Sequence, residues 1–531
     1  MAVGDRTPRA WAAGGPFHVS PLRFGPAVVR KDMGQRCDDV PLELRVPMSK
    51  LRLVQGGMAE TRLGEQILRR GPEAAMARLE AAAWHGRPSM SVVGLDHAGV
   101  VSAACFAHLG FRVVGVDVCA EKVAHVAAGR SPVAEDRVDT FLSAGVGCGL
   151  VRATQNLVAA VLETDITFIC LGLETQPDGS CDLGPLLRAA RAIGQALSMK
   201  SSYHVIVLRC RLPPGTTLGV VACEIQRASG RMLGPDFGVG FSPVLMREGT
   251  AVADFFDPRK IVVGAFDQHV RTMVGSIFAS IDAKLVVTTI EAAEMVRLVD
   301  SAWRATKVAF GNEVGRLCKA LDIDSHDVME ILADDPQCDL PCADLKPGFA
   351  LGGSLQSEDV RAVGRLAHEH GVSVPMIDAL PVSNARHVDH ALRLLEPFRD
   401  LRLGFLGLTF EPGVRDLAGS PVLDLMAALQ ARDVAMKAYD GGLPAGTDLE
   451  RHTDQVRRAV PRQSRLIDIL DHLLTDDADE LLGWADVLVV CHATSETRGL
   501  VDRRKNGCHV LDLGRLHKVL PAGSAYQGIA W

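Results

Sequence analysis

The chain has 531 residues, which is too many for one ordinary domain and predicts two or three. Hydrophobic residues make up 47% and charged residues 23% of the sequence, a balance that excludes a largely disordered chain. The net charge of −7 gives no reason to expect nucleic acid or an anionic membrane as a partner.

Residues 1–88 are rich in Arg, Pro and Gly, and only 60–84 shows a helical spacing of apolar residues. We expect a flexible N-terminal extension with one amphipathic helix. Two alternatives stay open. The start codon could be placed too early, because Met90 directly precedes the first clear strand, or the segment could dock onto a partner. Arg, Asp and Pro interrupt each apolar stretch up to residue 90, so no signal peptide is predicted.

The pattern changes at residue 90. An apolar run (90–95) with Gly94 near its end is followed by a helical stretch and by a second β-like run (111–117) that closes on Asp117. Further β-like runs lie at 166–171, 204–208, 260–264 and 284–287, with helical patterns between most of them. This alternation predicts a doubly wound, mostly parallel sheet, and we assign it to residues 89–288.

The next segment, 289–396, is helical in period over 290–335 and 358–396. A second series of β-like runs follows at 401–408, 433–440, 485–491 and 509–513. We therefore predict an α/β fold in which a helical connector joins two Rossmann-like domains, the second over 397–531. The two α/β halves are not obvious sequence repeats of each other.

The turn after the first predicted strand reads GlyLeuAspHisAlaGly (94–99). A dinucleotide fingerprint has Gly where Asp96 stands, so that the backbone can approach the diphosphate. At about 4 Å and an effective dielectric near 20, each repulsion between Asp96 and a phosphate is of order 4 kcal/mol. We expect NAD binding that is weakened by Asp96. The alternative is that Asp96 only caps the first helix.

A ribose-binding carboxylate is expected at the end of the second strand of such a unit. Asp117 lies 23 residues after Gly94, where this carboxylate belongs, and Lys122 could reach the ribose or a phosphate. The pattern supports Rossmann topology more strongly than it supports tight NAD binding.

A series of motifs runs from residue 94 to the last residue: GlyLeuAspHisAlaGly (94–99), GlyValAsp (115–117), SerProValLeuMetArgGluGly (242–249), the helical segment 294–315, LysProGlyPheAlaLeuGlyGlySer (346–354), GlyLeuThrPheGluProGly (407–413), SerPro (420–421) and GlyIleAlaTrp (528–531). In this order they resemble the UDP-glucose and GDP-mannose 6-dehydrogenase family, with the GDP-mannose 6-dehydrogenases the nearer likeness. The resemblance extends over residues 90–531.

The resemblance implies an NAD-binding domain (89–288), a central helical dimerisation domain (289–396) and a nucleotide-sugar-binding domain (397–531), and hence a homodimer. The family oxidises the sugar C6 hydroxyl to a carboxylate with two NAD⁺, and a cysteine holds the intermediate as a thiohemiacetal and then a thioester. This chemistry needs a soft nucleophile, a cationic donor for the oxyanion and a carboxylate that handles water.

Most of the matching positions here hold residues that cannot perform this chemistry. The family's nucleophilic Cys follows the GlyGlySer turn, where this chain has Leu355. Its Lys is matched by Arg297, which cannot exchange a proton, and its oxyanion-holding Asn by Ser301. Its Glu for hydrolysis is matched by Val244, and its water-orienting Thr by Arg211.

Two helpers of the family's set are retained, Asp359 and Glu248, which together with Arg297 form a vestigial catalytic set. Two cationic positions carry carboxylates instead: the Lys after the family's catalytic Cys is Glu358, and a Lys of the C-terminal domain is Glu411. By resemblance the cofactor positions are Gly94, His97, Ala98, Gly99, Asp117, Lys122, Leu173 and Arg211. The substrate positions are Arg247, Glu248, Arg297, Lys346, Phe349, Gly352 and Gly353.

One general acid–base group is typically worth about 10² to 10⁴ in rate, but the joint loss of nucleophile, Lys, Asn and Glu leaves no recognisable route to the acid. We expect an inactive or strongly impaired family member that acts in exopolysaccharide biosynthesis as a regulator or assembly subunit, with a GDP-mannose or UDP-glucose type of nucleotide sugar as ligand. Two alternatives stay open: an active NAD-dependent GDP-mannose or UDP-glucose 6-dehydrogenase with atypical chemistry, rescued for example by Cys338 or Cys342, and a decayed gene product.

The thirteen cysteines include no CxxC pair, which argues against a disulfide framework or a zinc site and favours a reducing cytoplasm. No apolar run reaches the roughly 18 residues of a membrane helix. We therefore expect a cytoplasmic protein with no metal and no membrane partner.

Overall fold

The computed structural model describes residues 87–133, 135–173, 176, 180–334, 345–414, 417–443, 463–518 and 525–531, and only the backbone of 354–357 and 464. All described residues belong to one compact unit, Gln66–Trp531. The predicted extension, apart from residues 87–88, lies outside the described residues.

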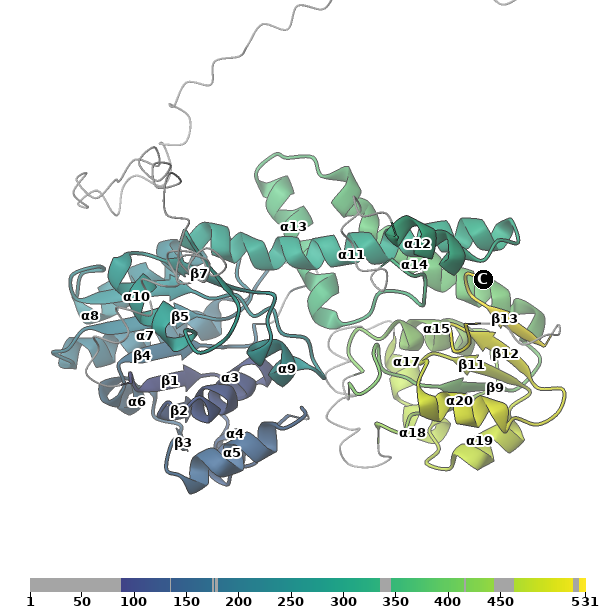
Figure 1. Ribbon diagram of the computed structural model, residues 1–531, viewed down its shortest axis with the longest axis horizontal. Coiled ribbons are helices and arrows are strands. Elements are labelled where there is room, and N and C mark those ends of the chain that lie inside the picture. The colour runs from purple at the N-terminus through teal and green to yellow at the C-terminus, as the bar shows by residue number, and fades with distance from the viewer. Residues whose placement is uncertain are drawn as a thin grey trace, which may run out of the picture. The chain divides into compact units, whose positions relative to one another are not determined.

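The first sheet has eight strands in the order β3-β2-β1-β4-β5-β6-β7-β8 (Figure 1). Its strands are β1 (Met90–Val93), β2 (Val113–Val116), β3 (Val151–Thr154), β4 (Ile166–Ile169), β5 (His204–Leu208), β6 (Phe237–Phe241), β7 (Lys260–Ala265) and β8 (Lys284–Thr288). Only β6 and β7 pair antiparallel. Because β1 lies between β2 and β4, the strand order reverses there, and doubly wound folds bind ligands outside the carboxyl ends of the strands at such a point.

Helices cover both faces of this sheet, because side chains of successive strand residues point to opposite sides. Val92 and Phe168 pack in one buried cluster with residues of α3, whereas Val93 and Ile169 pack in clusters with α6 and α7. The helices are α3 (His97–His108), α4 (Ala120–Ala127), α5 (Val138–Gly147), α6 (Leu157–Glu163), α7 (Gly184–Met199), α8 (Cys223–Ser229), α9 (Ala251–Phe256) and α10 (Gln268–Ile277), with a π-helical turn, η3 (Thr217–Ala222).

The central segment is helical, as expected. It contains α11 (Ile290–Ala320), α12 (Ser325–Ala333), α13 (Ser354–Glu369), α14 (Pro375–Leu395) and a 3₁₀ turn, η5 (Glu396–Phe398). Thr289 caps α11 by accepting a hydrogen bond from the backbone N–H of Ala292 (3.2 Å). Ala305, Val360 and Leu380 form the buried contact between α11, α13 and α14.

The second sheet is parallel, in the order β10-β9-β11-β12-β13. Phe405 packs in one buried cluster with residues of α15, whereas its neighbour Leu406 packs in another with residues of α19 and α20. In Figure 1, α15 lies on one side of this sheet, and α19 and α20 lie on the other. This sheet is therefore also covered on both faces. The elements are β9 (Leu403–Leu406), β10 (Met436–Tyr439), β11 (Val487–Val490), β12 (His509–Asp512), β13 (Tyr526–Gly528), α15 (Pro421–Gln430), α17 (Ser464–Ile467), α18 (Leu470–Leu473), α19 (Ala478–Trp484) and α20 (Ser495–Asp502).

The predicted fold class is confirmed, but three strands were missed. β3 and β13 are short edge strands with polar residues among the apolar ones. β6 reads PheGlyValGlyPhe, and its glycines leave room for neighbours: a Cβ on Gly238 would lie 2.3 Å from Cγ2 of Val270. Among the described residues, no helix is long and apolar enough to span a membrane.

Candidate functional site

The turn between β1 and α3 depends on two glycines. Gly94 has a φ of +92°, and a Cβ there would lie 2.8 Å from the carbonyl oxygen of Cys170. A Cβ on Gly99 would lie 1.8 Å from the carbonyl oxygen of Gly94. Both positions therefore require glycine, the first for its backbone conformation and both for the close approach of β1, α3 and β4.

Asp117 is buried at the carboxyl end of β2 and fastens this turn. Its Oδ2 accepts a hydrogen bond from the backbone N–H of Leu95 (2.7 Å), and its Oδ1 accepts one from Cys119 (2.8 Å). A carboxylate has about four lone-pair sites, so capacity remains for ribose hydroxyls. The geometry fits the adenosine half of a dinucleotide.

Asp96 does not cap α3. It occupies the N-cap position, but its side chain makes no capping hydrogen bond. Its carboxylate instead accepts a hydrogen bond from Lys122, whose Nζ also lies 4.0 Å from Oδ2 of Asp117. Burial lowers the pKa of Lys122, but the hydrogen bond to Asp96 and the charges of Asp96 and Asp117 raise it more, so that it lies above its usual value. The prediction that Asp96 acts only as a helix cap is wrong.

This pairing changes how well a diphosphate fits. Lys122 partly neutralises Asp96 and so offsets the predicted repulsion, but the cation is then committed to two carboxylates. Asp96 still adds a charged side chain where the fingerprint has none. The residues present therefore fit the adenosine end of NAD better than its diphosphate. When bound, NAD supplies the hydride acceptor for oxidation of an alcohol.

Three other residues at the predicted cofactor positions make contacts within the protein. His97 Nε2 lies 2.7 Å from Oε2 of Glu135. The Glu135 carboxylate also accepts hydrogen bonds from the backbone N–H groups of Gly249 (2.8 Å, to Oε2) and Ala251 (3.0 Å, to Oε1). Burial raises the pKa of Glu135, but these hydrogen bonds lower it more, so that it lies below its usual range. The carbonyl of Ala98 accepts from Ser102 (2.6 Å), and Leu173 packs in the buried cluster with α7.

Several substituted catalytic positions meet at Asp359, on the second turn of α13. The Asp359 side chain is fully buried; Ser301 donates to its Oδ2 (2.6 Å), and Arg297 Nε lies 3.4 Å from the same oxygen. Arg211 Nε lies 3.5 Å from Oδ1, an oxygen that accepts no hydrogen bond. Burial raises the pKa of Asp359, and the charges of Arg297 and Arg211 lower it only in part.

Two further contacts extend this group. Arg211 donates a hydrogen bond to Glu358, and Arg297 donates to the carbonyl oxygen of Val244 (2.5 Å). Arg211, Arg297, Ser301, Glu358 and Asp359 therefore form one network, the Asp359 cluster. Its one nucleophilic group is the hydroxyl of Ser301, which donates its hydrogen bond to Asp359. Its two guanidinium groups do not exchange protons near neutral pH. Leu355 lies on the first turn of the same helix.

The loop before α13 is held by two asparagines. Asn312 accepts from the backbone N–H of Gly348 (3.2 Å) and donates to the carbonyl of Phe349 (3.1 Å). Asn384 accepts from Leu351 (2.7 Å) and donates back to its carbonyl (2.9 Å). The predicted substrate residues in this loop therefore have a defined backbone conformation.

The GlyGly pair at the end of this loop requires glycine at both positions. A Cβ on Gly352 would lie 2.2 Å from Cβ of Phe410. Gly353 has a φ of +92°, and its N–H donates to the carbonyl of Gly419 (3.1 Å). The turn that leads into α13 is thus packed against the segments that follow β9.

The remaining predicted substrate residues lie outside the Asp359 cluster. Arg247 pairs with Asp254 through both its backbone N–H (2.9 Å) and its guanidinium (2.8 Å). Lys346 donates to Glu330 (2.5 Å), and Glu248 is half-buried in the loop between β6 and α9. Cys338 and Cys342, proposed as rescuing thiols, lie outside the described residues.

Four anchoring residues were not predicted: Glu135, Asn312, Asn384 and Glu294. Glu294, fully buried on α11, accepts hydrogen bonds from the backbone N–H groups of Gly215 (2.6 Å) and Thr217 (2.9 Å) and from the Thr217 hydroxyl (2.6 Å). Burial raises the pKa of Glu294 above its usual value despite these hydrogen bonds. Its place on the apolar side of α11, beside Ala293, was the one signal in the sequence that it is buried.

The second sheet repeats the turn of the first. Gly407 has a φ of +96°, and the N–H of Leu408 donates to Oδ2 of Asp440 (2.7 Å), as Leu95 does to Asp117. The other oxygen of Asp440 accepts from the N–H of Gly442 (3.0 Å). Both sheets therefore place a buried turn and a carboxylate at the carboxyl ends of their first two strands.

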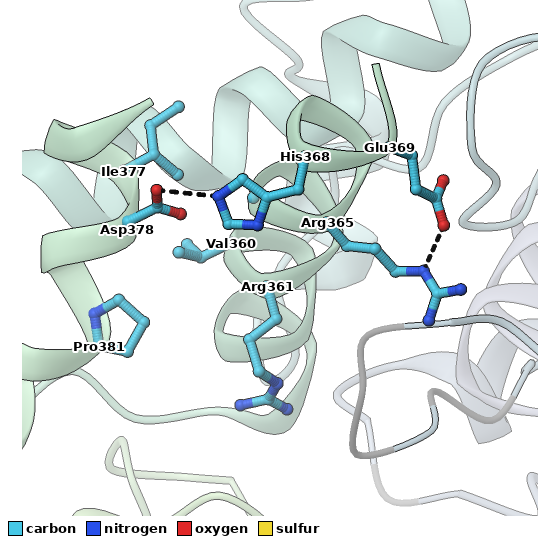
Figure 2. Close-up of a pocket in the computed structure, with 9 residues that line it drawn as sticks. Val360, Arg361, Arg365, His368, Glu369, Ile377, Asp378 and Pro381 are labelled. Atoms are coloured by element: carbon cyan, nitrogen blue, oxygen red, sulfur yellow. Dashed lines mark hydrogen bonds and ion pairs between the residues drawn. The ribbon is translucent and has the colours of Figure 1, made fainter. Parts of the chain in front are cut away.

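An open pocket lies between α13 and α14, away from both turns (Figure 2). His368 lies 3.1 Å from Asp378 across it, and Arg365 donates to Glu369 (2.7 Å). None of the predicted site residues lines this pocket. Among the described residues, no group of three or more His, Cys, Asp or Glu is arranged to hold a metal ion.

The two doubly wound sheets and the turn at Gly94 and Asp117 define a dinucleotide-binding type of α/β protein. The model of the UDP-glucose/GDP-mannose dehydrogenase family, NAD-binding domain, matches residues 89–282, and that of its central domain matches residues 291–386. GDP-mannose 6-dehydrogenase of Pseudomonas aeruginosa is 33% identical over 442 residues, covering 83% of this chain and 100% of that protein. The chain belongs to the UDP-glucose/GDP-mannose dehydrogenase family.

Two further comparisons give similarity to UDP-glucose dehydrogenases. UDP-glucose 6-dehydrogenase of Haloferax volcanii is 33% identical over 66% of this chain and 83% of that protein. The structure of a UDP-glucose dehydrogenase from the archaeon Pyrobaculum islandicum matches with a TM-score of 0.73 at 30% identity, covering 84% of this chain and 98% of that one. The resemblance predicted from the motifs is confirmed.

Proposed function

We propose that this chain keeps the scaffold of a nucleotide-sugar 6-dehydrogenase but does not carry out the four-electron oxidation, or does so only very slowly. The observation that carries the proposal is the Asp359 cluster. Its two guanidinium groups pair with two carboxylates of α13, so the polar groups at the matched catalytic positions are bound to one another.

The chemistry of these residues supports the same conclusion. The position of the family's nucleophile holds Leu355, whose side chain has no atom that can form a thiohemiacetal. Arg297 has no proton to exchange near neutral pH. Val244 contributes only its backbone carbonyl, as an acceptor for Arg297. No residue of the Asp359 cluster replaces both the nucleophile and the base.

We further propose that the chain binds NAD weakly and a nucleotide sugar of the GDP-mannose or UDP-glucose type, and that it acts in exopolysaccharide biosynthesis as a regulatory or assembly subunit. The geometry of Asp117 supports cofactor binding, and the names of the relatives support the class of sugar. No disulfide joins any two of the ten described cysteines, which supports a cytoplasmic location.

A homodimer through α11 belongs to the same proposal. Four large apolar side chains are exposed along this helix: Val299 (48%), Trp303 (49%), Phe310 (49%) and Leu317 (60%). Their spacings of four, seven and seven residues are those of a coiled-coil seam, which α-helices bury against a second helix. A row of this kind on a water-exposed face indicates a protein interface.

An active NAD-dependent GDP-mannose or UDP-glucose 6-dehydrogenase with atypical chemistry is the second candidate. It is favoured by the intact turn around Asp117 and by the retention of Asp359 and Glu248. A two-electron oxidation to the aldehyde needs no thiol, but it still requires a proton acceptor.

The deciding experiment measures binding of NAD⁺, GDP-mannose and UDP-glucose to the full chain by calorimetry, and NADH absorbance in the same samples. Binding without NADH supports the proposed non-catalytic role. NADH formed above that of the buffer control, in a preparation free of other dehydrogenases, supports the second candidate. If none of the three ligands binds and no NADH forms, the proposed ligand binding and the second candidate are both wrong. The Pseudomonas aeruginosa enzyme is the positive control.

A further inference from the structure

Together with the Val244 carbonyl that accepts from Arg297, the Asp359 cluster joins four segments that are distant in the sequence. Arg211 follows β5, and Val244 follows β6, at the carboxyl ends of two neighbouring strands of the first sheet. Arg297 and Ser301 lie one turn apart on α11, and Glu358 and Asp359 lie on α13. The contacts therefore run from the edge of the sheet to two helices of the central segment.

The charges within the cluster are balanced. Two guanidinium groups alternate with two carboxylates, from Glu358 through Arg211 and Asp359 to Arg297. The Arg211 and Arg297 side chains are 15% and 16% exposed and that of Asp359 is fully buried, so solvent screens these pairs less than it screens surface pairs. Removal of one member leaves a poorly solvated charge without its partner, which is costly.

A second anchor holds the same loop of the first sheet. Glu294 of α11 accepts hydrogen bonds from Gly215 and Thr217, only a few residues after Arg211. Segment 211–217 is thus held by carboxylates from α13 at one end and from α11 at the other. Segments at the carboxyl ends of the strands are those that ligands contact in doubly wound folds.

We propose that the Asp359 cluster is a clasp that fastens segment 209–217 and the start of α13 to each other, so that these two segments open together and not separately. It is a conformational device at the edge of the first sheet. Because the clasp consists of the chain's own residues, it acts whether or not the chain binds or oxidises a sugar.

Amide hydrogen exchange followed by mass spectrometry tests this proposal on the full chain without any ligand. Arg211→Gln is expected to accelerate exchange about tenfold in peptides covering both 209–217 and 354–362, because both ends of the clasp are released. Glu358→Gln is expected to have a smaller effect in the same two peptides, because Arg211 still contacts Asp359 in this variant. The double variant is expected to exchange no faster than Arg211→Gln alone, since its second change removes a partner that is already lost.

Glu480→Gln is the matched control. It removes a half-exposed acid of α19 that pairs with Lys437 of β10, more than a hundred positions from the residues of the cluster, and should leave both peptides unchanged. Circular dichroism shows whether each variant is folded. If Arg211→Gln does not fold, Glu358→Gln provides the second measurement, because it removes one partner of Arg211 and should also accelerate both peptides, by a smaller factor.

Three results would overturn the proposal: unchanged exchange in both peptides, acceleration in only one of them, or effects of the two substitutions that multiply. The last result would mean that Arg211 and Glu358 act independently. None of these readouts depends on catalytic activity.

Discussion

Arg211, in the loop after β5, donates a hydrogen bond to Glu358 on α13, 147 residues further along the chain. By resemblance the family has Thr at the first position and Lys at the second. Either change alone would be unfavourable: Arg211 opposite a lysine would bring two cations together, and Glu358 without Arg211 would leave two adjacent carboxylates with one fewer cation. The two substitutions stabilise each other, which favours a maintained fold over a decayed gene product.

This mutual dependence predicts how the stability of the fold changes when Glu358 and Arg211 are replaced by the residues of the family. Glu358→Lys alone should destabilise the fold by about 1–3 kcal/mol, because it places a cation beside Arg211 in a partly buried site. Glu358→Lys combined with Arg211→Thr should recover most of this loss. The stability of both variants is compared with that of the wild type through the midpoint temperature of thermal unfolding. A single variant as stable as the wild type, or a double variant less stable than the single one, contradicts the prediction.

The turn at Asp96 predicts a gain in cofactor affinity. Asp96→Gly removes the carboxylate from the diphosphate position and releases Lys122 from it. Because Lys122 already offsets part of the repulsion, the expected gain in NAD⁺ affinity is about tenfold rather than the thousandfold of an unpaired carboxylate. Calorimetry with the full chain measures it. Asp96→Gly combined with Lys122→Ala is the control and should lose most of the gain, whereas equal affinity of Asp96→Gly and wild type would contradict the role given to Asp96.

Sequence patterns predicted the parts of this molecule that depend on neighbouring residues. The apolar run 90–95, the turn glycines Gly94 and Gly99, and Asp117 at the end of the second strand are local features, and the structure contains each of them. Strand β6 was missed because its two glycines are explained by neighbours that are distant in the sequence: Tyr203 and Val270 pack over Gly238, and Gly264 and Val270 lie close to Gly240. A local pattern carries no information about such a neighbour.

The partners of charged side chains were harder to predict, because they are set by the folded chain. Lys122 was expected at a phosphate and pairs with Asp96; His97 was expected at the cofactor and contacts Glu135. The resemblance marked Arg211, Arg297 and Asp359 as site positions, but nothing in the sequence showed that they contact one another. Such pairings join residues that lie 26 to 147 positions apart in the sequence.

His387 predicts a dependence of stability on pH. Its Nε2 lies 2.8 Å from the carbonyl of Gly348, and its Nδ1 lies 3.1 Å from Arg316, so the neutral ring donates to the first and accepts from the second. Burial lowers the pKa of His387 to about 4. Because the unfolded chain takes up this proton near pH 6.5 and the folded chain does not, the stability contribution is complete above about pH 6.5.

This contribution is lost as the pH falls from about 6.5 to about 4, and its full size is about 3 kcal/mol. His387→Gln should flatten the fall in stability over this range, as measured by urea unfolding at a series of pH values. His368→Gln changes an exposed residue and is the control. Parallel pH profiles for wild type and His387→Gln would exclude the predicted role.

Restoring the nucleophile alone should not restore activity. In Leu355→Cys the thiol would lack the Lys, Asn and Glu positions that the family uses with it, and members of a catalytic unit are strongly non-additive. We expect no NADH from this variant with GDP-mannose and NAD⁺. Val244→Glu, Arg297→Lys and Ser301→Asn added to it should give measurable NADH, provided that Arg211→Thr and Glu358→Lys are also made. Turnover by the single variant would show that the Asp359 cluster supports catalysis.

The apolar row on α11 predicts how the chain associates. Trp303→Glu and Phe310→Glu each place a charge in the middle of the proposed helix–helix seam, where it would be buried without a partner. Each should convert dimers to monomers in sedimentation equilibrium, or weaken association about a hundredfold, since burying an unpaired charge costs at least about 3 kcal/mol.

Met199→Glu is the matched control for the two α11 variants, because Met199 is 62% exposed at the end of α7 and is not part of the row. Both helix variants should keep the wild-type circular dichroism spectrum, since the substituted side chains are half exposed in the single chain. A wild-type chain that sediments as a monomer at all concentrations would remove the dimer from the proposal, and dimers that survive both substitutions would place the interface elsewhere.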